Sequence, residues 1–75
     1  MSHPRPASDP CPGMTVQESD GSTRLVVTVG PADSAGLADT QRWVKWKGRD
    51  QRNLICSLAN WKELAARDGW QVLME

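Results

Sequence analysis

The stretch RWVKWKGRDQRNLICSL, residues 42–58, decides how this chain folds. Its first part alternates with a period of two, which in a strand puts Val44 and Trp46 on one face and Trp43 on the other. The polar residues in the middle are typical of a turn, and apolar residues follow them. We therefore predict a strand, a turn and a returning strand over 42–47, 50–53 and 54–58.

The last part of this stretch also fits a helix. Four apolar residues share one helical face at their spacing, namely Leu54, Leu58, Trp61 and Ala65. A continuous helix capped by Asn53 and ended by Gly69 would replace the returning strand. Residues 32–47 leave a second helical alternative open, between Pro31 and Gly48.

The segments on either side predict the rest of the fold. Residues 24–29, RLVVTV, are rich in β-branched side chains and are followed by Gly-Pro, which indicates a strand. Asn60 can cap a helix over 61–68, and Gly69 supplies the left-handed residue that ends one. A short strand over 70–74 completes the pattern. We expect an α+β fold, a small three- to four-stranded antiparallel sheet with one short C-terminal helix packed on it.

The N-terminal segment has a different composition. Prolines at positions 4, 6, 10 and 12 fix the backbone and remove amide donors, so neither a helix nor a strand ladder can propagate. The residues that follow are mostly polar and include the turn dipeptide Asp20-Gly21. We predict that residues 1–22 form a flexible proline-rich, disordered tail and that residues 23–75 form a single small domain.

The net charge of the chain is zero, which argues against binding of a polyanion by the whole molecule. The charges are nevertheless divided unevenly. Residues 1–40 carry two basic and five acidic side chains, whereas residues 41–75 carry seven basic and four acidic ones. Electrostatic recognition should therefore involve the second half.

The residues that usually carry catalysis or bind metals are sparse. His3 lies in the predicted tail, and Cys11 and Cys56 are too far apart in sequence to give the spacing of metal ligands. Two cysteines also do not make a disulfide framework. There is no phosphate-binding glycine motif, no apolar run long enough to span a membrane and no signal-like segment. We expect a cytoplasmic protein that is not an enzyme, with no catalytic residues, no cofactor, no metal and no membrane association.

Tryptophan is the main positive signal, because the chain has four tryptophans and no other large aromatic residue. Trp46, Trp61 and Trp70 have the spacing of core residues. Trp43 points the other way in the predicted strand, toward basic side chains. We therefore predict a partner-binding surface formed by Trp43, Lys45, Lys47, Arg49 and Arg52.

The segment Val44–Gly48, VKWKG, resembles the second strand of chromodomains, which have a three-stranded sheet followed by a helix. The resemblance implies that Trp46 helps form an aromatic cage for methyl-lysine through cation–π attraction. Arg49 stands where that family has an aromatic residue, and the chain has no Tyr or Phe to complete the cage. We therefore use this match, five residues of 75, as support for the hairpin alone.

These observations favour a non-catalytic protein-binding module, such as a small inhibitor or adapter that occludes a partner protein. Small size suits a protein carried by a phage or another mobile element. The alternative is nucleic-acid binding through the basic hairpin over 42–52. A homodimer stays open as well.

Overall fold

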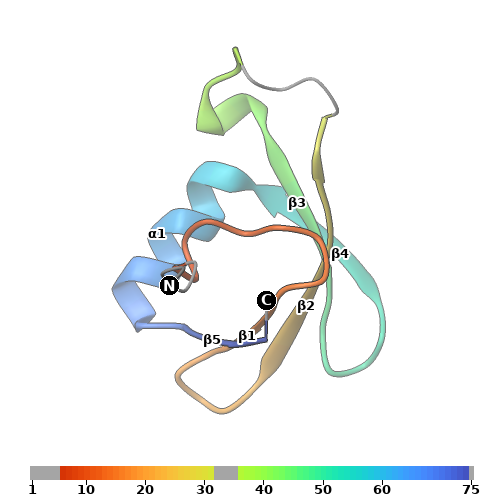
Figure 1. The fold of residues 1–75 in the computed structure, drawn as a ribbon, viewed down its shortest axis with the longest axis vertical. Helices are drawn as coiled ribbons and strands as arrows, with labels where there is room; N and C mark the ends of the chain where they lie inside the picture. Colours follow the sequence, from red (N-terminus) through yellow and green to blue (C-terminus); the bar gives the residue numbers. More distant parts are fainter. Residues whose placement is uncertain (1–5, 32–35, 75) are drawn as a thin grey trace, which may run out of the picture.

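The computed structural model describes residues 6–31 and 36–74. They form a five-stranded antiparallel open sheet with one C-terminal helix, which confirms the predicted α+β class (Figure 1). The strands lie in the order β4-β3-β2-β1-β5. The elements, in chain order, are β1 (Thr15–Gln17), β2 (Thr23–Gly30), the 3-10 helix η1 (Asp39–Gln41), β3 (Trp43–Lys47), β4 (Asn53–Ser57), α1 (Leu58–Asp68) and β5 (Gln71–Met74).

The predicted strand–turn–strand over 42–58 is confirmed, with the strand ends within one residue of those predicted. β3 pairs with β4 so that Val44 lies opposite Cys56 and Lys45 opposite Ile55. The helical alternative for 54–58 is therefore wrong, and so is a helix throughout 32–47, since β3 lies within that range. The local pattern allowed either a strand or a helix here, and the pairing with β3 selects the strand.

The helix begins earlier than predicted. Ser57, rather than Asn60, is the N-cap, and its hydroxyl accepts a hydrogen bond of 3.1 Å from the Asn60 amide. Both residue types are good caps, and the end of β4 decides which of them is used. Gly69 ends the helix in the left-handed conformation, with φ of 64°, as predicted. The buried face of α1 consists of Leu58, Trp61 and Ala65.

The N-terminal segment differs most from the prediction. β1 lies inside the sheet between β2 and β5, and Met14 and Val16 are 0% exposed. Before it, residues 6–13 cross the side of the sheet that carries α1, and the buried Trp61 indole N–H donates to the Ala7 carbonyl at 2.8 Å (Figure 1). Residues 6–22 thus belong to the folded unit, whereas the part of the predicted tail over 1–5 lies outside the described residues.

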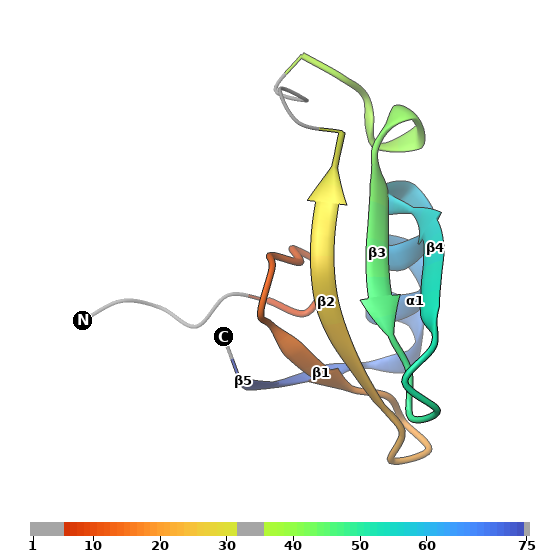
Figure 2. The ribbon, with the colours of Figure 1, turned by 90° about the vertical axis from the view of Figure 1, so that its right-hand side faces the viewer.

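The two faces of the sheet differ in what covers them. Figure 2 shows β2, β3 and β4 side by side with α1 behind them. We call the face toward α1 the inner face and the opposite face of these three strands the outer face. None of the described helices is long and apolar enough to span a membrane.

Candidate functional site

Three of the four tryptophans meet on the inner face, around one arginine. The Arg24 guanidinium carbon lies 4.0 Å from the ring centroid of Trp46 and 4.3 Å from that of Trp70. Trp61 meets both rings edge-on, with centroids 6.3 Å from Trp46 and 5.1 Å from Trp70. Arg24 Nη2 also donates to a Glu18 carboxylate oxygen at 3.0 Å. Each contact between a cation and an indole face contributes about 0.5–2 kcal/mol. The Arg24 guanidinium therefore stabilises the packing of the three inner tryptophans.

This arrangement bears on the part of the sequence that resembles chromodomains. Trp46 makes its cation–π contact within the chain, because the Arg24 side chain lies on its ring and is only 13% exposed. The positive charge of Arg24 is matched by Glu18 at the same place. The inner tryptophans therefore have a structural explanation, and a candidate site has to be sought elsewhere.

Trp43 lies on the outer face, as the alternation of β3 predicts, but it is half-buried. Gly30 on β2 is paired with Trp43 on β3, and a methyl group added at Gly30 would lie 2.6 Å from Trp43 Cη2. The indole therefore packs directly on the backbone of β2, where any larger residue would collide with it. This contact limits the orientation of the ring, and part of the ring remains exposed to solvent.

Trp43 is paired with Gly30 and Ser57, and lysines and apolar residues follow it along the outer face toward the β3–β4 turn. One row contains Leu25, Lys47 and Asn53, and the next contains Thr28, Lys45 and Ile55. Leu25 is 42% exposed and Ile55 is 64% exposed. Sequence analysis missed these two apolar residues, because only the register shows that they share a face with the lysines.

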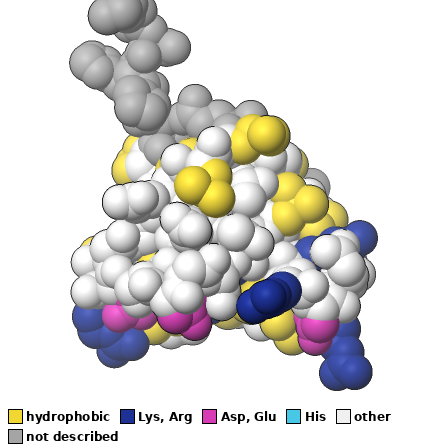
Figure 3. Space-filling model, turned by 90° about the horizontal axis from the view of Figure 1, so that it is seen from below, with side chains coloured by type: hydrophobic (Ala, Val, Ile, Leu, Met, Phe, Trp, Pro, Cys, Tyr) yellow, Lys and Arg dark blue, Asp and Glu magenta, His cyan; other side chains and the backbone are white. Residues whose placement is uncertain are grey.

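The remaining two predicted site residues, Arg49 and Arg52, lie in the exposed turn between β3 and β4. Asp50 holds this turn, accepting from the Arg52 amide at 3.2 Å and lying 3.6 Å from Arg52 Nε. Figure 3 views the molecule from the end where the hairpin turns lie, and the Lys and Arg side chains seen there lie in separate groups, some of them beside acidic side chains. The structure thus places Trp43, Lys45 and Lys47 on one face of β3, and it places the two arginines in the turn beyond Lys47, at the opposite end of the strand from Trp43.

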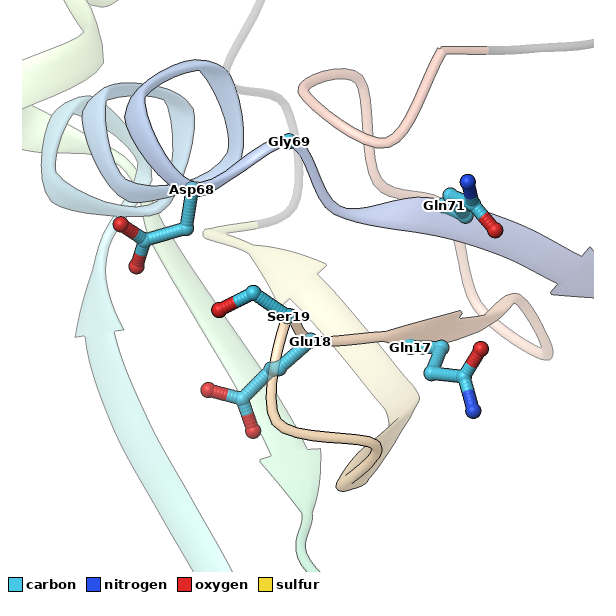
Figure 4. Close-up of a pocket in the computed structure, with 6 residues that line it drawn as sticks. All are labelled: Gln17, Glu18, Ser19, Asp68, Gly69 and Gln71. Atoms are coloured by element: carbon cyan, nitrogen blue, oxygen red, sulfur yellow. The ribbon is translucent and has the colours of Figure 1, made fainter.

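A small hollow lies on another side, between the end of β1 and the end of α1 (Figure 4). It has a volume of about 190 Å³ and is lined by Gln17, Glu18, Ser19, Asp68, Gly69 and Gln71. Glu18 is already bound to Arg24, and no described histidine or cysteine lines the hollow. Within residues 6–31 and 36–74, no group of three or more His, Cys, Asp or Glu residues could hold a metal ion.

Comparisons with known proteins give no guide to the site. No protein-family model matches this chain, and neither the curated proteins nor the solved structures contain a match. The assignment of function therefore depends on the geometry of the chain itself.

Proposed function

We propose that this chain is a non-catalytic module that binds another protein through the outer face of β2, β3 and β4. The observation that carries the proposal is the outer face itself, where Trp43 is held against Gly30 at one end and lysines and exposed apolar residues follow along the strands. Tryptophan is enriched in the energetic centres of protein interfaces, and a ring that is already fixed loses little entropy on binding. An inhibitor or adapter that occludes its partner would work in this way.

Nucleic-acid binding through residues 42–52 is the competing function. It needs several unpaired cations along one path, since phosphate contacts supply most of the affinity. Arg52 lies beside Asp50, and at the end of the molecule seen in Figure 3 the Lys and Arg side chains lie in separate groups. The exposed side chains of Leu25 and Ile55 would contribute little to phosphate binding. These features favour a protein partner.

The test is capture of a partner from a lysate of the source cells by the immobilised full chain, with and without nuclease. The variant carries Trp43→Ala, Lys45→Ala and Lys47→Ala together. We expect it to lose the partner, because removal of an aromatic anchor costs about 2 kcal/mol or more of binding energy. The matched control, Lys62→Ala with Arg67→Ala, removes two positive charges from α1 and should still bind.

Salt dependence separates the two functions. Binding through about four phosphates would weaken with a log–log slope of roughly −3 to −4 as salt rises. An interface centred on Trp43 should respond weakly and should survive nuclease treatment. Capture that persists in the triple variant, or that disappears with nuclease, would rule out the proposed function.

A further inference from the structure

The free edge of β4 has backbone groups that no described strand pairs with. β4 is the last strand of the sheet, and in Figure 2 it forms the right-hand margin. The Leu58 amide donates to the Arg42 carbonyl at 2.9 Å, so Leu58 and Arg42 form a hydrogen-bonded pair of the β3–β4 ladder. Hydrogen-bonded and non-hydrogen-bonded pairs alternate along an antiparallel ladder, so the backbone N–H and C=O groups of Leu54 and Cys56 also point toward β3. The N–H and C=O groups of Asn53 and Ile55 therefore point outward from the sheet.

The features that usually protect an edge strand are missing from β4. The sequence NLICS contains no charge and no proline, and its register against β3 shows no bulge. Asn53, Leu54 and Ile55 are all exposed. The opposite edge, β5, is shorter and pairs with β1 through a register shift beside Val16, which twists it out of line. β4 is therefore the better template for an added strand.

The charges near this edge indicate what kind of strand it would accept. Lys45 and Lys47 lie on the adjacent strand, and the basic turn with Arg49 and Arg52 follows at one end. Asn53 is short, so the lysine side chain beside it can extend toward an added strand. A second copy of this chain would bring the same positive charges to the interface, and like charges oppose one another there. Carboxylates on the incoming strand would be attracted instead.

We propose that β4 accepts an extended acidic segment of a partner protein as an additional antiparallel or parallel strand of the sheet. This inference rests on the proposed function and specifies its partner. Main-chain hydrogen bonds to Asn53 and Ile55 would supply affinity, as in other cases of strand addition. Lys45 and Lys47 would select for acidic side chains, and the exposed Ile55 would contact an apolar residue between them.

The experiment selects binders to the immobilised full chain from a library of random linear peptides about ten residues long, enough for one strand. We expect selected peptides to alternate acidic with β-branched residues. Bound peptide should slow amide hydrogen exchange at Asn53 and Ile55 by roughly tenfold or more and leave Leu54 and Cys56, already in the ladder, much less affected.

The decisive variant is Asn53→Pro, which removes an outward-facing N–H from the first residue of the strand, a position where proline is tolerated. It should weaken peptide binding roughly tenfold or more, whereas Asn53→Ala, which keeps the N–H, should bind like the original chain. If Asn53→Pro does not fold, Ile55→Glu serves in its place, since a carboxylate on this edge repels an acidic strand, with the uncharged Ile55→Thr as its control.

The remaining outcomes each overturn the inference. They are a library that yields no binders, peptides that are basic, peptides that bind the proline variant equally well, and a dimer in which Asn53 and Ile55 are protected without peptide.

The experiments distinguish failure of strand addition from failure of the proposed function. If the triple variant at positions 43, 45 and 47 loses its partner while Asn53→Pro keeps both partner and peptide, only strand addition is wrong. If the partner survives the triple variant, the proposed function is wrong.

Discussion

Trp43 and Trp46 stand three residues apart on β3 and have opposite surroundings. Trp46 faces α1 and lies against Arg24 and Trp61, inside a group of aromatic rings. Trp43 faces outward and lies on Gly30, beside lysines. The side chains are identical, so the difference comes from the face of the strand on which each lies. Tryptophan content alone therefore does not tell which rings face the core and which face outward, whereas strand alternation does.

The largest effect should come from the centre of the inner face. Trp61 is 0% exposed, contacts two other tryptophans and donates to Ala7, so Trp61→Ala should destabilise the chain by about 3–5 kcal/mol. Leu64, three residues after Trp61 on the same helix, is only partly buried against the core. Leu64→Ala should therefore cost clearly less. Urea unfolding measures both, and equal midpoints for the two variants would contradict this view of the helix.

Arg24 tests whether the inner tryptophans need their cation. Arg24→Ala removes a guanidinium that contacts two rings closely and leaves Glu18 without its partner, so we expect a loss of about 2–4 kcal/mol. Glu18→Gln keeps the side-chain shape and removes only the charge, and it should cost less. If both variants lose the same amount in urea unfolding, the ion pair rather than the ring contacts provides the stability.

The N-terminal segment should matter for the inner face and not for the outer one. A chain that begins at Met14 lacks the Ala7 carbonyl and leaves the buried Trp61 N–H unpaired, so it should lose about 1–3 kcal/mol. The flexible, disordered tail that the sequence analysis predicts would instead leave the stability unchanged when it is removed. Melting of the shortened and full chains, with capture of the partner as a second readout, checks both points. An unchanged melting temperature would support the tail prediction.

The sequence predicts those parts of this fold that depend on local patterns. Alternation in 42–47 predicts β3 and the outward side of Trp43, and Gly69 predicts the end of α1. β1 has only three residues, too few for a periodic signal, and its burial depends on β2 and β5. Leu25 joins the candidate site through pairing across β2 and β3, which no local pattern contains.

Gly30 offers a way to disturb Trp43 without changing the ring itself. Gly30→Ala places a methyl group inside the indole, so the ring must move away from β2, and we expect a loss of about 1–3 kcal/mol from overpacking. If the fixed ring is the binding element, partner affinity should fall even though every candidate side chain is retained. The control is Gly48→Ala, where the nearest atom, Trp46 Cζ3, is 3.4 Å away and needs little movement. Equal affinity for both variants would show that the orientation of Trp43 is unimportant.

The smallest effect concerns Cys56, which neighbours the inner tryptophans on β4. Burial raises the pKa of the Cys56 thiol above its ordinary value of 9.0, because the charged thiolate is poorly solvated there. Below that pH the thiol is neutral in both states, and its contribution to stability is fully present. As the pH rises past 9.0 the unfolded chain ionises first, so stability should fall progressively until the folded thiol ionises too. Cys56→Ala has no thiol to ionise, so its stability lacks this pH dependence. The difference in urea midpoint between the variant and the original chain should therefore change as the pH rises above 9.0, and it should level off beyond the pKa of the folded thiol. A difference that stays constant over this range would show that the thiol ionises equally in both states, and hence that the inner face is open to water at β4.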